Sequence, residues 1–492
     1  MKLNKKTLLL LLILFPILVN AASEEEIKVN HGFPRLMGIN IGNKAYDDPL
    51  YRKELSKVDV LIISFYPGWG TYKGVNAEQR TVAAIKQLNP TMLVGQYTML
   101  GEAPASDNEQ SASTDIGRKI DENNWWLRNA EGERVQWTNL YNKWDVNITE
   151  FMSPDGDGLY YPQWLARRDY NIYFENNSEF DIWYFDNALS RSPVKLADWN
   201  QDRRNDLNTH PDVARAYRMG NIAEWEEAKK LNPNLLLLGN SDDISSVEYQ
   251  NQLHGVLMEA VIGKSWSMVN WYGWDGIMKR YRTNMKYTLG PHLVGFNIWG
   301  ESTDYQGMRY GLASCLLDNG YFSYTDNSEG YSSVPWFDEF DVDLGLPVDP
   351  PAERVWNNGV YRRLFERGMV LVNPGEYPKT VRIEPGYKKI KGGQDPVTNN
   401  GGVVTTLTLK GKDGVILLKY SLEQNKPVVN PTSAPDISDF NFTSEQSQST
   451  SEPTSTESNS TSKSTSKQND FSLKPAYGGG RSRSSGESAV ID

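Results

Sequence analysis

Two carboxylic acids in this chain lie in apolar runs that are typical of buried strands. Asp186 ends the run at residues 182–185, and Asn187 follows it. Glu259 lies inside a second run, at residues 256–261. In α/β folds, ligands bind at the carboxyl ends of the strands. Two carboxylic acids that meet at such an edge can serve as nucleophile and general acid, which is the chemistry of glycoside hydrolysis.

The surroundings of the two acids predict different roles. An apolar strand should raise the pKa of Glu259, because desolvation disfavours the charged form, and a protonated carboxylic acid suits a general acid. Asp186 has a polar neighbour and should remain ionised, which suits a nucleophile. Two structural readings stay open on the sequence. Asp186 could cap the next helix, and Glu259 could pair with a cation such as Lys264.

The elements that would position these acids are eight short apolar runs that alternate with helical segments. This alternation predicts a (β/α)₈ TIM barrel over residues 32–345. The alternative is an open doubly wound sheet, but Gly38 and Gly42 lack the third glycine that its fingerprint needs. The predicted strands are residues 36–42, 58–66, 92–99, 181–187, 234–240, 255–261, 292–300 and 320–326.

Aromatic and amide side chains stand near the ends of the other predicted strands. Aromatic rings can stack on the C–H faces of a sugar, and amides can bind its hydroxyl groups. The chain has 15 Trp and 26 Tyr, many of them beside Gly, Asn or Asp. A carbohydrate is therefore the expected substrate. The predicted substrate-binding residues are Tyr66, Gln96, Tyr97, Asn187, Asn240, Asn297 and Trp299.

Several other kinds of chemistry lack their usual residues. The four histidines are scattered without metal-ligand spacing, so we expect no metal site. The chain has no Gly-x-Ser-x-Gly turn and no P-loop, and we expect no cofactor. A net charge of −11 argues against nucleic acid as a partner. Cys315 is the only cysteine, so no disulfide can form within the chain, and its apolar neighbours predict burial.

The two ends of the chain differ in composition from the barrel. Residues 1–22 combine lysines, an apolar run and small residues, which predicts a signal peptide and a secreted or extracytoplasmic protein without a membrane span. A retained N-terminal anchor is the alternative. Residues 352–421 contain short strands and Gly-rich turns, which predict a small antiparallel β-sandwich. Residues 424–492 are rich in Ser and Thr and are predicted to be disordered. Nothing in the sequence indicates the oligomeric state.

Several segments resemble the glycoside hydrolases of the "hypothetical glycosyl hydrolase family 15" type, which are distantly similar to endo-α-1,4-polygalactosaminidase barrels and to the α-galactosidase clan. The resemblance implies a barrel with a small β-domain over about residues 32–421. It also implies a catalytic Asp at the end of strand four and a catalytic Glu at the end of strand six, here Asp186 and Glu259. An Asp-Gly pair often precedes strand four in these proteins, and this chain has Asp181 and Ile182 there. The segments are residues 124–128, 147–149, 161–165, 182–187, 257–259, 336–340 and 368–374.

The sequence therefore favours a secreted glycoside hydrolase that cleaves O-glycosidic bonds in a poly- or oligosaccharide. We expect a retaining mechanism, which needs the two carboxyl groups about 5–5.5 Å apart, whereas an inverting one needs about 6.5–9.5 Å. A carbohydrate-binding or surface protein on the same barrel, without catalysis, is the alternative. A transglycosylase that uses the same residues is a third hypothesis.

Overall fold

The computed structural model describes residues 32–42, 45–64, 77–105 and 114–420. The predicted signal peptide, Tyr66 and the predicted disordered segment lie outside these ranges. Within them, every helix is too short or too polar to cross a membrane.

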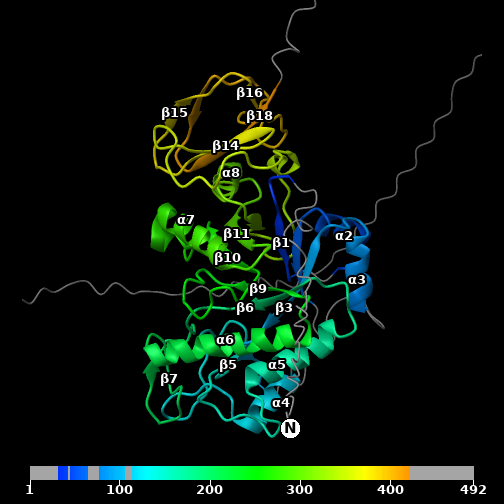
Figure 1. Ribbon diagram of the computed structural model, residues 1–492, viewed down its shortest axis with the longest axis vertical. Helices are drawn as coiled ribbons and strands as arrows, with labels where there is room; N and C mark the ends of the chain where they lie inside the picture. The colour runs from blue at the N-terminus through cyan, green and yellow to red at the C-terminus, as the bar shows by residue number, and fades with distance from the viewer. Residues whose placement is uncertain (1–31, 43–44, 65–76, 106–113, 421–492) are drawn as a thin grey trace, which may run out of the picture.

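Eight parallel strands follow one another in chain order round a single sheet (Figure 1). The sheet is nearly closed, because Leu36 pairs in parallel with Phe322, and the backbone N–H of Phe322 donates to the carbonyl of Arg35 at 2.8 Å. This order confirms the predicted TIM-like barrel and excludes the open doubly wound sheet. The strands are β1 (Met37–Asn40), β2 (Val60–Ile63), β3 (Leu93–Met99), β6 (Ile182–Asp186), β9 (Leu236–Asn240), β10 (Gly255–Ile262), β11 (Leu293–Gly300) and β12 (Tyr321–Asp326).

Helices lie between most of these strands, as the sequence pattern predicts, but residues 241–254 join β9 to β10 by turns without a helix. In α7, two helical pieces meet at Gly273, whose φ is 64°. The helices are α2 (Pro49–Leu55), α3 (Ala77–Lys86), α4 (Thr114–Asn123), α5 (Tyr161–Asp169), α6 (Pro211–Leu231), α7 (Val269–Tyr287) and α8 (Tyr305–Cys315), with a π-helix η1 (Tyr170–Phe174) and a 3₁₀ helix η2 (Asp338–Asp341).

The side chains of each strand alternate between the barrel interior and the surrounding helices, because successive residues of a strand point to opposite faces. On β6, Ile182 and Tyr184 belong to the interior cluster, whereas Trp183 and Phe185 belong to the cluster under the helices. All four are buried. Asp186 therefore follows the interior face, on the side of Ile182 and Tyr184.

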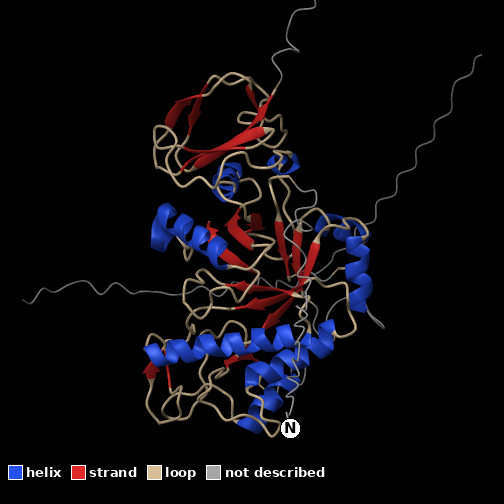
Figure 2. Cartoon of the chain, in the orientation of Figure 1, coloured by secondary structure: helices blue, strands red, loops and turns tan. Residues whose placement is uncertain are grey.

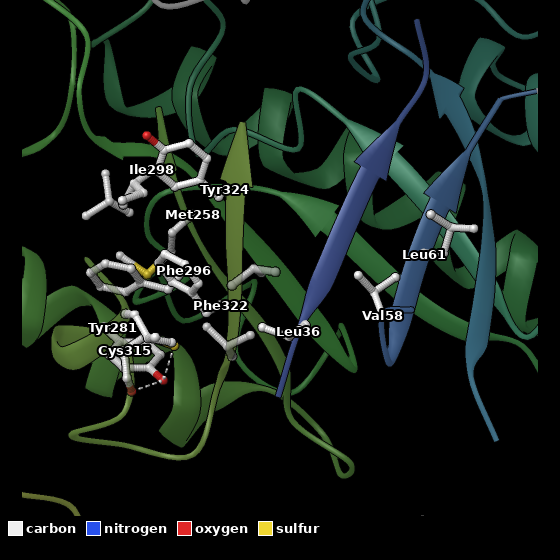
Figure 3. Close-up of a cluster of buried hydrophobic side chains, with 14 of the residues drawn as sticks. Leu36, Val58, Leu61, Met258, Tyr281, Phe296, Ile298, Cys315, Phe322 and Tyr324 are labelled. Carbon is white, nitrogen blue, oxygen red and sulfur yellow. Dashed lines mark hydrogen bonds between the residues drawn. The ribbon is translucent and has the colours of Figure 1, made fainter. Parts of the chain in front are cut away.

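Figure 3 shows part of the outer cluster, with Met258 and Phe296 among the labelled side chains. Cys315 is buried there, as predicted, and the hydroxyl of Tyr281 donates to its carbonyl at 3.1 Å (Figure 3). This layer packs the strands against α7 and α8.

A long segment between β3 and β6 builds a second apolar core beside the barrel. It includes Trp125, Trp126 and Ile120, and Tyr217 of α6 belongs to the same cluster. In Figure 1 it gathers with α6 at the end of the molecule opposite the C-terminal sheets, and Figure 2 shows that much of it is loop. Its short strands are β4 (Glu102–Ala103) and β5 (Trp144–Asp145), and β7 (Leu196–Ala197) pairs with β8 (Asp206–Leu207) after β6.

Two antiparallel sheets follow the barrel, in agreement with the predicted small β-domain. They share an apolar core that includes Leu371, Val381 and Leu407. Arg309 of α8 ties them to the barrel through Asp395 at 2.7 Å and Asp413 at 3.2 Å. The first sheet contains β13 (Tyr361–Leu364), β14 (Gly368–Asn373), β18 (Asp413–Lys419) and β16 (Tyr387–Lys389), and the second contains β15 (Lys379–Arg382) and β17 (Thr406–Leu409).

Candidate active site

A pocket lies at the carboxyl ends of the barrel strands. It encloses about 640 Å³ of empty space, part of it open to solvent. Both predicted catalytic acids line it. The lining residues are Ile39, Ile41, Tyr97, Met99, Glu102, Trp137, Tyr141, Lys143, Tyr184, Asp186, Asn187, Asn240, Leu257, Glu259 and Tyr331.

Glu259 reaches this pocket from β10, beside a β-bulge. Pairing of β10 with β11 is regular up to Met258 and resumes at Ile262, so the register shifts between them. Ala260, inside the bulge, has a positive φ of 47°. Leu257 and Ala260 both face the barrel interior, and Glu259 lies between them. Glu259 is two residues after Leu257, so strand alternation directs it inward, and the bulge that follows brings Ala260 to the same face.

Asn240 of β9 joins the two carboxylates. Its Nδ2 donates to Oδ1 of Asp186 and to Oε2 of Glu259, each at 2.8 Å. These two oxygens therefore lie no farther apart than twice that distance. Each acid also accepts a hydrogen bond from a phenol. The hydroxyl of Tyr97 donates to Oδ2 of Asp186 at 2.5 Å, and that of Tyr331 donates to Oε1 of Glu259.

The electrostatic setting of the two acids differs. Burial, and then the negative charge of Asp186, raise the pKa of Glu259 to about 7, against the hydrogen bonds from Tyr331 and Asn240. Burial also raises the pKa of Asp186, while hydrogen bonds from Tyr97, Asn240 and the backbone N–H of Asn187 lower it. Asp186 thus accepts three hydrogen bonds that favour its carboxylate, and Glu259 accepts two.

Three of the predicted substrate-binding residues line the pocket. Tyr97 and Asn240 contact the acids directly. Asn187 follows Asp186 in the left-handed region, with a φ of 51°, and its Nδ2 donates to the sulfur of Met99 at 3.8 Å. An asparagine tolerates this conformation better than most residues, so Asn187 suits the turn after β6.

Three other predicted residues lie behind the pocket wall. Gln96 is fully buried, and its Nε2 donates to the carbonyl of Tyr97 at 2.8 Å. Asn297 accepts the backbone N–H of Ala260 at 3.0 Å, so it supports the bulge that carries Glu259. Trp299 packs edge-on against Tyr331, with ring centroids 5.2 Å apart. Tyr66 lies outside the described residues.

The structure also bears on the two non-catalytic roles that the sequence left open, a helix cap for Asp186 and an ion pair for Glu259. No helix directly follows Asp186, since the next one, α6, begins at Pro211, so the helix-cap reading of Asp186 is wrong. Lys264 lies over the ring of Trp299 at 4.2 Å and donates to Oδ1 of Asn327. The hydrogen bonds on Glu259 come from Asn240 and Tyr331 instead.

Ten lining residues are not among the predicted site residues, and five of these ten lie outside the predicted strands. Tyr331 lies in the loop after β12, and its carbonyl accepts the backbone N–H of Gly42 at 2.8 Å. The other four, Glu102, Trp137, Tyr141 and Lys143, come from the segment between β3 and β6. Its length and its tryptophans are the available signal for such a role. Among the described residues, no group of three or more His, Cys, Asp or Glu side chains is placed to hold a metal ion.

Comparisons with known proteins complete this picture. No curated protein sequence matches the chain. Among solved structures, an α-amylase from Lactobacillus plantarum is 11% identical, with 79% of this chain and 98% of that chain covered and a TM-score of 0.44. The GH36 α-galactosidase AgaB from Geobacillus stearothermophilus is 10% identical, with 79% and 55% covered and a TM-score of 0.41. The glycoside hydrolase domain of PelA from Pseudomonas aeruginosa is 13% identical, with 62% and 99% covered and a TM-score of 0.38.

At these identities and scores, the three structures carry no weight for the substrate or the mechanism of this chain. The family comparison is more extensive. The model of the hypothetical glycosyl hydrolase family 15 matches residues 86–369, which is more than half of the chain and includes both carboxylates of the pocket. The chain belongs to the hypothetical glycosyl hydrolase family 15.

Proposed function

We propose that the protein is an active, retaining glycoside hydrolase that cleaves O-glycosidic bonds in a poly- or oligosaccharide. The observation that carries the proposal is the bridge from Asn240 to Asp186 and Glu259. It limits the nearest carboxylate oxygens to a separation of at most twice 2.8 Å. The limit applies to one oxygen of each carboxyl group, and it supports the closer carboxyl spacing of retaining enzymes, about 5–5.5 Å.

In the first step, Asp186 attacks the anomeric carbon of the sugar. The bond to the leaving oxygen breaks, and Glu259 gives that oxygen its proton. Burial raises the pKa of Asp186, and the hydrogen bonds from Tyr97, Asn240 and Asn187 oppose this and favour the ionised form that attacks. The raised pKa of Glu259, about 7, lets a large share of the protein hold the proton at neutral pH.

In the second step, a water molecule attacks the anomeric carbon of the glycosyl ester on Asp186. Glu259, now a carboxylate, takes the proton of this water, and the ester bond to Asp186 breaks. The charge on Asp186 disappears while the ester exists. The pKa of Glu259 should fall at this stage, because that charge contributes to raising it. A lower pKa keeps Glu259 ionised as the general base, and the release of Asp186 then restores the starting state.

A panel of polysaccharides and oligosaccharides, with reducing ends measured after incubation, tests the proposal. We expect hydrolysis of at least one glycan. Asp186→Asn should abolish it, and Glu259→Gln should slow it by about 10²–10⁴-fold, the usual contribution of a general acid. Asp212→Asn, at an exposed position on α6, is the matched control and should leave the rate unchanged.

The stereochemistry of the first product tests the retaining step. NMR of the newly formed reducing end should show the anomer of the substrate. The inverted anomer would contradict the proposed nucleophile. Binding of a glycan without hydrolysis, unchanged by Asp186→Asn, would instead support a carbohydrate-binding protein on this barrel.

We also propose that the protein is exported. The basic and apolar character of residues 1–22 supports this. Expression of the full chain, followed by N-terminal sequencing of the protein outside the cytoplasm, should give a start after residue 22. A protein that stays in the cytoplasm with its first residues intact would contradict this part of the proposal.

A further inference from the structure

One wall of the pocket comes from the segment between β3 and β6 rather than from the barrel. Glu102, just beyond β3, belongs to this wall and is buried. Its Oε2 accepts the indole N–H of Trp137 at 2.9 Å, and its Oε1 accepts Nζ of Lys143 at 3.3 Å. The backbone of Glu102 is fixed by pairing with Asp145 in the β4–β5 ladder. The wall is therefore built from fixed polar groups that face the catalytic acids across the pocket.

Tyr141 completes this wall. Its ring lies 6.2 Å from that of Trp137, and its half-buried side chain lines the pocket. Within the described part of the chain, its hydroxyl has no hydrogen-bond partner. Burial, followed by the negative charges of Glu102, Glu259 and Asp186, raises the pKa of Tyr141. A phenol that senses all three carboxylates lies close to the bond that the mechanism would break.

The described pocket lining has more acidic than basic side chains. Among its described residues, Lys143 is the only cation, and it is already paired with Glu102. Asp186 and Glu259 have no cation as hydrogen-bond donor, since Tyr97, Tyr331, Asn240 and a backbone N–H serve them. An acidic sugar placed here would meet the charge of Asp186, and the described lining has no second cation to offset it.

We infer that Glu102, Tyr141 and Lys143 recognise the hydroxyl groups of the bound sugar unit, and that the site rejects units with an acidic group. Glu102 accepts from one hydroxyl, Lys143 donates to its neighbour, and Tyr141 donates to an oxygen between the wall and the acids. The inference rests on the proposed function for the position of the cleaved bond.

Binding measured without turnover tests the inference. The full chain with Glu259→Gln keeps the charge of Asp186 and serves as the parent. The probes are matched series of equal linkage and length: oligoglucosides against oligoglucuronides and oligogalactosides against oligogalacturonides, in both anomers. We expect titration calorimetry to show binding of at least one neutral series, and binding at least tenfold weaker for its acidic counterpart.

Variants of the wall in the same parent identify the residues responsible. Tyr141→Phe removes one oxygen and should weaken binding about 3–10-fold, the range of an ordinary hydrogen bond. Lys143→Met and Glu102→Gln should weaken it by about 10–100-fold, because charged hydrogen bonds are stronger. Tyr377→Phe and Lys195→Met, at exposed positions, are matched controls and should bind like the parent.

Three results would overturn the inference: acidic oligosaccharides that bind as tightly as neutral ones, wall variants that bind like the parent, or no binding to either series. These outcomes are separate from those of the proposed function. Binding with the expected pattern, but no hydrolysis by the wild-type protein, would refute catalysis and leave the recognition wall intact. Hydrolysis by the wild-type protein with an unaffected Tyr141→Phe variant would refute the wall alone.

Discussion

Replacing Tyr331 by phenylalanine should move the alkaline limb of the pH profile of kcat/KM toward higher pH. The hydroxyl of Tyr331 donates to Oε1 of Glu259, and this bond favours the ionised carboxylate. Without it, the pKa of Glu259 should rise above its value of about 7. A general acid must be protonated, so a higher pKa extends activity to higher pH.

The size of the shift follows from the strength of the lost bond. A hydrogen bond to a charged group contributes about 1.5–3 kcal/mol, and one pKa unit corresponds to about 1.4 kcal/mol, so the limb should move by about 1–2 pH units. The phenylalanine ring keeps the edge contact with Trp299, which limits other changes.

Tyr97→Phe is the matched variant for the other acid. The hydroxyl of Tyr97 lies 2.5 Å from Oδ2 of Asp186, and its hydrogen bond lowers the pKa of that acid. Its loss should raise this pKa, and the acidic limb should move upward, because a nucleophile must be ionised. The assay is the initial rate at low substrate concentration from pH 4 to pH 10, on the glycan that the panel identifies, since kcat/KM reports the free enzyme.

Exchanged limbs would refute the assigned roles. If Tyr331→Phe moved the acidic limb and Tyr97→Phe the alkaline one, Glu259 would be the nucleophile and Asp186 the acid. If both variants kept the wild-type profile, neither carboxylate would control catalysis. Thermal unfolding of both variants should stay close to wild type, which separates a change in pKa from a loss of folded protein.

Three further predictions concern the support of the site. Asn240→Ala should lower kcat/KM by about 10–100-fold, because it removes a hydrogen bond to each acid; a rate within twofold of wild type would contradict the role of the bridge. Gly263→Ala should unfold at much lower denaturant concentration than wild type, because a Cβ there would lie 1.6 Å from the carbonyl oxygen of Trp299. A Cβ at Gly132 meets open space, so Gly132→Ala should lose far less stability. Burial raises the pKa of Asp145 to about 8, so the folded protein binds this proton more tightly than the unfolded chain does. The free energy of unfolding should therefore fall as pH rises from about 4 to 8. Urea titrations of Asp145→Asn should lose this pH dependence, and a variant with the same pH dependence as wild type would contradict the prediction.

The barrel and its two acids could be predicted because they rest on local patterns. Residues 182–185 are apolar on both faces of the strand, as in a sheet covered by helices on one side and filled with side chains on the other. The carboxyl end of such a strand is a defined place in the fold, so Asp186 could be placed at the rim from the sequence. The same reasoning places Glu259 in the site, two strands further round the barrel.

The remaining parts depend on geometry that a sequence pattern does not contain. The bulge at Ala260 changes which side chains of β10 face inward, and it turns Asn297 from an expected sugar ligand into a support for the backbone of Ala260. Tyr331 and Lys143 reach the pocket from loops, whose paths depend on tertiary packing. Loop positions have no period of 2 or 3.6 residues, so neither residue could be assigned to the site beforehand.

The central claim is that Asp186 attacks the anomeric carbon while Glu259 supplies the proton. Its most direct test is peptide mass spectrometry after reaction with an activated 2-deoxy-2-fluoro glycoside of the sugar that the panel identifies, since the fluorine slows the release of a covalent intermediate. The account predicts one added sugar on the peptide that carries Asp186, and none in Asp186→Asn. Attachment to Glu259 or another residue, or no adduct on an enzyme that hydrolyses the parent glycoside, would contradict it.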